Sequence, residues 1–86
     1  MRLDKFLKVS RLAKRRSEAK EALDARRIEC AGKPVKASYT VKPGDELTIH
    51  YATRTVRVRV EAVPERPAQK TSPHELYSIL GDVRSR

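Results

Sequence analysis

The first third of the chain has the spacing of apolar residues that is typical of helices. Leu3, Phe6 and Leu7 follow the three-and-four spacing that brings side chains onto one helix face, which predicts a short helix over about residues 3–9. Ser17 can act as the N-cap of a second helix. The buried face of this second helix would consist of small and apolar side chains, namely Ala19, Ala22 and Leu23. Because alanine is small, we expect the two helices to pack closely together.

After the second helix the pattern changes to short strands that are separated by turns. Ala31-Gly32 predicts a tight hairpin, and residues 42–45, Lys-Pro-Gly-Asp, predict a β-turn. A strand over residues 46–51 should follow this turn. Residues 55–60 alternate valine with polar side chains, which predicts the most regular strand of the chain, with the valines facing the core.

The C-terminal third has a different composition. Three prolines fall within residues 64–73 and almost nothing there can be buried, which predicts an extended linker. Residues 72–75, Ser-Pro-His-Glu, form a capping box that predicts a short helix. The apolar side of this helix would consist of Leu76, Ile79 and Leu80. The chain is therefore divided into a domain (1–63), a linker (64–73) and a short helix with a tail (74–86). We expect the helix to dock on the domain, with a separate protein partner as the alternative.

These elements predict an α+β fold, with two short N-terminal helices packed on a small antiparallel sheet. At 86 residues the chain has material for a modest core, and a large enclosed catalytic pocket is not expected. Apolar residues never exceed two in a row, so no membrane span is expected. Cys30 is the only cysteine, which fits a reducing compartment and a cytoplasmic protein. We expect the protein to be a monomer.

Charge is the strongest compositional signal. Lys and Arg number 20 against 11 Asp and Glu, a net charge of +9, which indicates a polyanionic partner. The basic excess is concentrated near the N-terminus, where Asp4 is the only acidic residue among residues 1–16. Aromatic residues make up only 5% of the chain, too few for stacking along a single strand, so we expect contacts to the phosphates of folded RNA or a duplex. The predicted RNA-binding residues are Arg2, Lys5, Lys8, Arg11, Lys14, Arg15, Arg16 and Lys20.

No arrangement of residues indicates catalysis. His50 and His74 lie far apart in the sequence, and Cys30 has no second thiol, so a zinc site lacks ligands. The glycines are too scattered for a phosphate-binding loop, and no nucleophile motif is present. We therefore expect no catalytic residues, no metal, no cofactor, no small-molecule substrate and no enzyme activity.

Several short motifs of the N-terminal half, taken together, resemble the S4 RNA-binding motif. They are Arg2-Leu3-Asp4-Lys5-Phe6-Leu7, Ser10-Arg11-Leu12, Arg15-Arg16-Ser17-Glu18-Ala19, Arg27-Ile28, Gly32-Lys33 and the Lys-Pro-Gly-Asp turn. The resemblance covers roughly residues 1–51. Two positions depart from the pattern, because Arg26 stands where such modules usually have glycine, and Ala31 precedes Gly32 where asparagine is common. A chain with little besides this module is similar to the stand-alone S4 proteins of bacterial ribosome-associated quality control and, more distantly, to the heat-shock S4 protein.

The resemblance implies an S4-like (αL) RNA-binding module that associates with ribosomes. The implied partners are a 23S rRNA helix of the large (50S) subunit, peptidyl-tRNA in the P site, and RqcH, whose alanine tailing of stalled nascent chains the protein would assist. Asp4 would support the RNA-facing residues as a helix cap or by orienting an arginine. Three alternatives stay open: a heat-shock-type factor that recycles stalled 50S complexes, an adaptor that recruits a protein through the C-terminal helix, and a DNA-binding protein.

Overall fold

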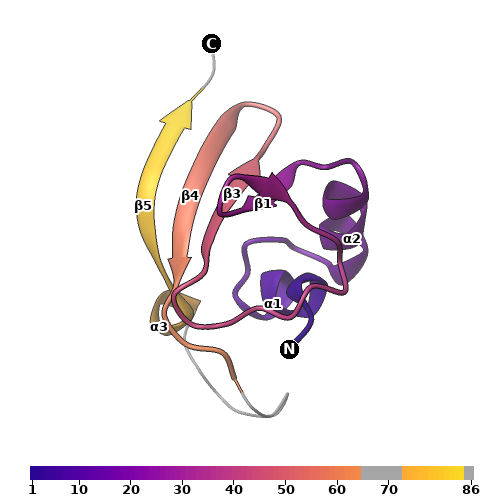
Figure 1. Ribbon diagram of the computed structural model, residues 1–86. Helices are drawn as coiled ribbons and strands as arrows, with labels where there is room; N and C mark the ends of the chain where they lie inside the picture. Colours follow the sequence, from indigo (N-terminus) through magenta and orange to yellow (C-terminus); the bar gives the residue numbers. More distant parts are fainter. Residues whose placement is uncertain (65–72, 85–86) are drawn as a thin grey trace.

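The computed structural model describes residues 1–64 and 73–84, and it has two layers (Figure 1). One layer is a five-stranded sheet with the order β2-β1-β3-β4-β5, in which every neighbouring pair is antiparallel. The other layer contains α1 and α2, which lie together on one side of the sheet. In chain order the elements are α1 (Leu3–Val9), α2 (Arg16–Asp24), β1 (Ile28–Cys30), β2 (Lys33–Pro34), β3 (Glu46–His50), β4 (Arg54–Val60), α3 (Pro73–Leu76) and β5 (Tyr77–Arg84). The predicted α+β fold is confirmed.

The core lies between the helices and one face of the sheet. Strand β4 follows its predicted alternation, because Val56, Val58 and Val60 are buried whereas Arg57 and Arg59 are exposed. The valines belong to the same buried cluster as the apolar faces of the two helices, which consist of Leu3, Phe6, Leu7, Ala19 and Leu23. The helix predicted over residues 3–9 is therefore confirmed, and the face that its spacing indicated is the buried one. The opposite face of β3 and β4 carries polar and charged side chains.

Both predicted turns are present. Ala31 and Gly32 have φ angles of 53° and 83°, the pair of positive values that a two-residue hairpin of type I′ requires. In the second turn the N–H of Asp45 donates to the carbonyl of Lys42 at 3.1 Å, and Gly44 has a φ of 93°. The first turn joins β1 to β2, and the second leads into β3.

The start of α2 differs from its prediction. The helix begins at Arg16, and its N-cap is Arg15, which makes no side-chain capping hydrogen bond. Ser17 therefore lies inside the first turn and is not the cap. Arg16 is instead held by an acidic side chain of α1, described below, and this tertiary contact outweighs the local preference of serine for the cap position.

The end of α2 is a Schellman motif built on an arginine. Arg26 adopts the left-handed conformation with a φ of 59°. Its N–H donates to the carbonyl of Leu23 at 3.0 Å, and the N–H of Arg27 donates to the carbonyl of Ala22 at 2.9 Å. The non-glycine residue at this position therefore leaves the helix end and the following strand register intact.

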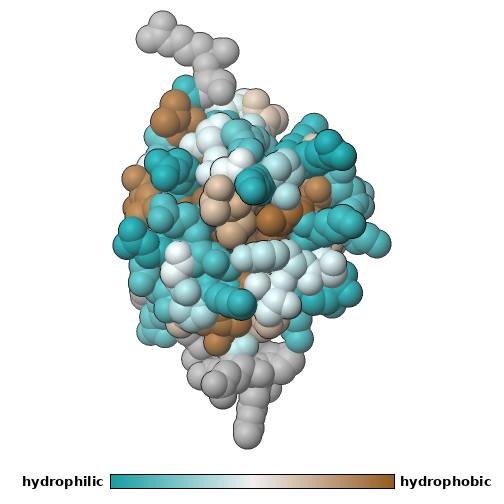
Figure 2. Space-filling model, in the orientation of Figure 1, coloured by the Kyte–Doolittle hydropathy of each residue, from teal (hydrophilic) through white to brown (hydrophobic). Residues whose placement is uncertain are grey.

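The C-terminal segment is part of the same sheet. A short helix begins at Pro73, as predicted, but it ends at Leu76, and the segment that follows is the strand β5, which pairs along β4. Leu76 is fully buried, whereas Ile79 and Val83 are 61% and 69% exposed. Figure 2 shows apolar patches along the β5 side of the molecule. The predicted apolar helix side of Leu76, Ile79 and Leu80 is therefore wrong, because pairing with the long edge of β4 satisfies more backbone groups than a short isolated helix could.

Residues 65–72, which include most of the predicted linker and the capping serine Ser72, lie outside the described residues. The linker therefore stays a prediction.

The left-handed arginine at the end of α2 yields a stability prediction. Replacing Arg26 by glycine should raise the free energy of unfolding by about 1 kcal/mol, because glycine adopts positive φ without the steric cost of a side chain. Urea denaturation measures the change. As a control, Lys20→Gly inside the same helix should lower stability by about 1 kcal/mol. A loss of stability in Arg26→Gly would contradict the strain at this position.

Candidate nucleic-acid interface

A buried carboxylate near the start of α1 holds two arginines. The side chain of Asp4 is only 3% exposed, and its Oδ2 accepts a hydrogen bond from Nε of Arg16 at 3.2 Å. Its Oδ1 lies 3.3 Å from Nε of Arg2 and accepts the backbone N–H of Lys5 at 2.8 Å. A buried charge is costly unless it is paired, so the carboxylate needs both guanidinium groups. We call Asp4, Arg2 and Arg16 the arginine clamp.

Three separate segments position the clamp. Arg2 precedes α1 and forms a β-bridge with Thr40, while the N–H of Leu3 donates to the carbonyl of Tyr39 at 2.8 Å. Arg16 is the first residue of α2, twelve positions after Asp4. The arginine side chains are 52% and 50% exposed, and each contacts the carboxylate through its Nε atom. Each guanidinium therefore keeps N–H donors for a ligand outside the protein.

The clamp opens onto a cavity with a basic lining. Arg2, Lys5 and Arg16 line this space of about 610 Å³, and its remaining lining residues are Met1, Pro43, Val63 and Pro64. Within residues 1–64 and 73–84, no acidic side chain lines this space. The arrangement can hold anionic groups such as phosphates, with Asp4 fixing the two guanidinium groups from below. We call this space the clamp cavity.

The structure divides the predicted RNA-binding residues into separate places. Arg11 and Lys14 line a different cavity of about 560 Å³, which we call the loop groove. It lies between the loop that joins α1 to α2 and the turn that joins β3 to β4, and it shares no lining residue with the clamp cavity. The other predicted residues, Lys8, Arg15 and Lys20, are exposed and line neither space.

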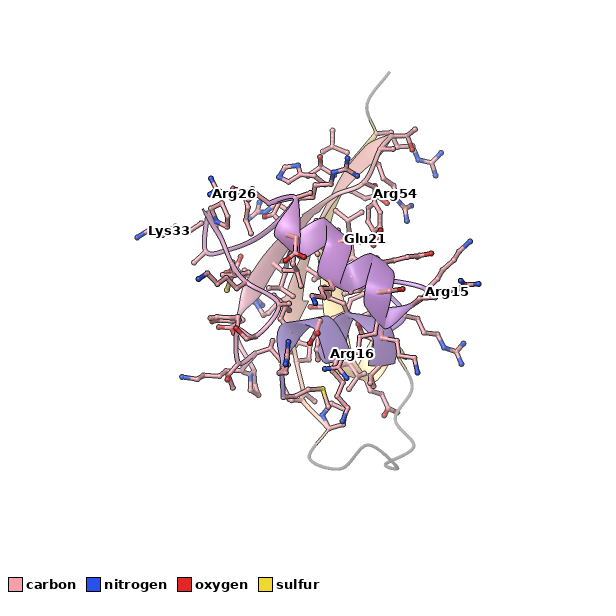
Figure 3. The ribbon with its side chains drawn as sticks, turned by 90° about the vertical axis from the view of Figure 1, so that its right-hand side faces the viewer. Arg15, Arg16, Glu21, Arg26, Lys33 and Arg54 are labelled. Atoms are coloured by element: carbon pink, nitrogen blue, oxygen red, sulfur yellow. The ribbon has the colours of Figure 1, made fainter. Side chains whose placement is uncertain are left out.

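Figure 3 shows how the basic side chains spread around α2. Arg15 and Arg54 project on one flank of the helix, whereas Arg26 and Lys33 lie on the opposite flank. Arg16 lies between these flanks, at the N-terminal end of the helix. The positive charge thus surrounds the helix layer and is not confined to one face.

Tyr51 ties the loop between α1 and α2 to the sheet. Its hydroxyl donates to the carbonyl of Leu12 at 2.6 Å. The guanidinium of Arg54 lies 5.2 Å from the centre of the Tyr51 ring and 3.5 Å from a carboxylate oxygen of Asp82. These contacts connect the loop, the β3–β4 turn and β5. Tyr51 and Arg54 were not predicted as site residues, because nothing in the sequence relates them to the loop, whose Leu12 lies 39 positions before Tyr51.

Two tyrosines have raised pKa values for identifiable reasons. Burial raises the pKa of Tyr51. The pKa of Tyr39 is raised by its contact with the Cys30 thiol at 3.6 Å, by burial, and by the hydrogen bond that its hydroxyl donates to Asp45 at 3.0 Å. Tyr39 also lies in the segment that holds the start of α1. Both phenols therefore act as neutral hydrogen-bond donors that brace the basic surface.

Within residues 1–64 and 73–84 no three His, Cys, Asp or Glu side chains gather in a group that could hold a metal ion. Over the same ranges no helix is both long and apolar enough to cross a membrane.

Comparisons with known proteins show which family this chain resembles. A family model described as "S4 domain" matches residues 1–47. The chain is 50% identical over 84 residues to the "RQC P-site tRNA stabilizing factor" of Bacillus subtilis (strain 168), covering 98% of this chain and 96% of that protein. Proteins of the same name from Listeria innocua and Streptococcus pneumoniae are 45% and 37% identical, covering 99% and 98% of this chain and 91% and 94% of theirs.

A solved structure shares the fold. The trimeric structure of Heat Shock Protein 15 from Vibrio cholerae superposes with a TM-score of 0.82, covering 92% of this chain and 80% of that one. At 24% sequence identity, this likeness concerns the arrangement of helices and strands.

The tyrosines yield a prediction on alkaline stability. A phenol whose native pKa is above its ordinary value of 10.0 keeps its proton where the unfolded chain loses it. The stability is therefore fully present below pH 10 and should fall as the pH rises toward the native pKa, by at most about 1.4 kcal/mol per pH unit for each tyrosine. Urea denaturation at a series of pH values from about 8 to about 11 measures this fall, because this interval spans the ordinary pKa of a tyrosine phenol. Tyr39→Phe and Tyr51→Phe should each make it shallower, and profiles parallel to the unmodified protein would contradict the assignment.

Proposed function

Because the chain belongs to the S4-domain family, in the group of RQC P-site tRNA stabilizing factors, we propose that it is a non-enzymatic RNA-binding factor of ribosome-associated quality control. It binds the large ribosomal subunit that carries peptidyl-tRNA, contacts a 23S rRNA helix and the P-site tRNA, and so steadies the tRNA. It assists RqcH-dependent alanine tailing without making a bond itself, and it acts in the cytoplasm on ribosomes.

The arginine clamp is the observation that carries this proposal. A guanidinium is planar and engages phosphate oxygens through two parallel N–H donors, so its orientation decides how well it fits. Asp4 fixes the orientation of Arg2 and Arg16 through their Nε atoms before any RNA arrives. Pre-ordering reduces the conformational entropy that binding would otherwise cost. The clamp therefore favours a rigid, folded RNA whose phosphates match two fixed guanidinium groups.

The distribution of charge supports an RNA ligand over a protein ligand. The net charge of +9 attracts polyanions over long range, and the clamp cavity adds a local site in which Lys5 reinforces the two arginines. The predicted contact residues Lys8, Arg11, Lys14, Arg15 and Lys20 are all exposed and add to this field. Phosphates of folded RNA fit both the long-range field and the local site, because they present dense negative charge at fixed positions.

A protein adaptor is the second candidate function. The C-terminal helix is too short to present the predicted apolar side, but Ile79 and Val83 on β5 are exposed and support a protein contact at that strand. The double variant Ile79→Ser with Val83→Ser separates the two functions. An RNA-binding factor keeps its affinity for 50S subunits, whereas an adaptor that reaches the ribosome through a protein loses it.

The first test of the main proposal reverses the charge of one clamp residue. Arg16→Glu should lose co-sedimentation with 50S subunits, because it removes a phosphate contact and adds repulsion beside Asp4. Arg16→Lys should bind with intermediate affinity, because lysine keeps the charge but not the planar fork. Sucrose-gradient sedimentation with purified 50S subunits is the measurement.

The matched control for this test is Arg59→Glu. Arg59 is exposed on β4, on the sheet face opposite the helices, and the same charge change there should leave sedimentation intact. Thermal unfolding of each variant confirms that it is folded. Wild-type co-sedimentation of folded Arg16→Glu would refute the clamp as the contact site.

The second test separates orientation from charge. Asp4→Asn raises the net charge by one but releases the two arginines, which are half exposed and can turn into solvent. We expect weaker binding to 50S subunits together with equal or stronger retention on a heparin column, because heparin responds to charge alone. If both affinities rise together, orientation by Asp4 has no part in recognition.

A further inference from the structure

The loop groove carries more positive charge than its surroundings neutralise. Arg11, Lys14, Arg27 and Arg54 line it, and Glu18 is the only carboxylate among the described residues of its lining. Among the ion pairs of the described residues, only one involves a cation of the groove, the contact of Arg54 with Asp82. The remaining cations face solvent without an acidic partner in the described part of the chain. Such a lining attracts an anionic ligand.

The floor of the same groove is apolar. The half-buried apolar side chains of its lining, which a ligand can reach, are Leu12, Ala13, Ala22, Tyr51 and Tyr77. A volume of about 560 Å³ is within the range of small-molecule and cofactor sites. A basic rim over an apolar floor is complementary to a nucleotide, which combines a flat, weakly polar base with a charged phosphate. Unpaired bases also stack on guanidinium planes, and Arg54 offers one above the Tyr51 ring.

Both walls of the groove are held in place by hydrogen bonds. On one side the hydroxyl of Tyr51 holds the carbonyl of Leu12 at 2.6 Å. On the other side the N–H of His50 donates to the carbonyl of Arg27 at 2.8 Å. The left-handed turn at Arg26 directs the chain into this second contact. The groove is therefore formed before a ligand binds, and little ordering is needed to fill it.

We propose that the loop groove is a second RNA-contact site, which takes one unpaired nucleotide with its base on the apolar floor and its phosphates against Arg11, Lys14 and Arg27. This inference rests on the proposed function and extends it. Because the loop groove and the clamp cavity share no residue, the protein can hold two RNA segments at once: a folded segment at the clamp and an unpaired nucleotide at the groove. An acidic peptide would satisfy the rim but would leave the apolar floor without a matching flat group.

The test uses single-stranded hexauridylate as the probe and amide chemical shifts of the full-length protein as the readout. We expect shifts concentrated in residues 11–14, 27 and 50–54. The double variant Lys14→Glu with Arg27→Glu should lose these shifts. It should also lower the slope of log affinity against log salt by about 1.4, since each phosphate contact of a single strand contributes about 0.7.

The matched control is Lys33→Glu with Lys42→Glu, which makes the same change of charge at exposed residues outside both cavities and should keep the shifts. Shifts confined to the surroundings of Arg2, Lys5 and Arg16 would overturn the second site while leaving the proposed function standing. Equal shifts and affinity with hexaglutamate would also overturn it, because the groove would then accept any polyanion. The proposed function fails separately, if folded Arg16→Glu still co-sediments with 50S subunits.

Discussion

The buried carboxylate of Asp4 is the contact on which the basic surface of this protein depends. A side chain that is 3% exposed must have its charge compensated, and among the described residues the cations that pair with it are Arg2 and Arg16. Meeting this requirement fixes the start of α1 against the start of α2. It also holds the two arginines as a pair of donors, so in the proposed function the same contact would serve both the stability of the helix pair and the recognition of phosphate.

The sheet has a less obvious part in building the binding surface. Its core face supports the helices through an unbroken apolar layer, while its β3–β4 turn reaches over to the loop between them. The hydrogen bond from Tyr51 to Leu12 and the stacking of Arg54 on Tyr51 make that turn a wall of the loop groove. The basic residues are consequently divided between two cavities, each with one helical and one non-helical wall. The proposed contacts with two RNA segments require two such separate sites.

The predictions that held are those in which the deciding interactions are close in sequence. The spacing of Leu3, Phe6 and Leu7 defines a helix face, and the turn at Ala31-Gly32 needs only local backbone geometry. Two predictions failed where a distant partner competed. Ser17 has the right chemistry for an N-cap, yet the pairing of Arg16 with Asp4 moves the helix start. The segment after Leu76 has the spacing of a helix, yet the open edge of β4 recruits it as a strand.

The sequence by itself determined the excess of positive charge near the N-terminus, the S4-like series of motifs, the apolar faces of the helices and the alternation of β4, because these depend on composition and on neighbours a few residues apart. Only the tertiary structure decided that Asp4 joins Arg2 to Arg16. It also decided that Arg11 and Lys14 line the loop groove and not the clamp cavity, and that Arg54 and Tyr51 complete the loop groove. Burial and opposition across the fold are properties of the whole chain, and no local pattern records them.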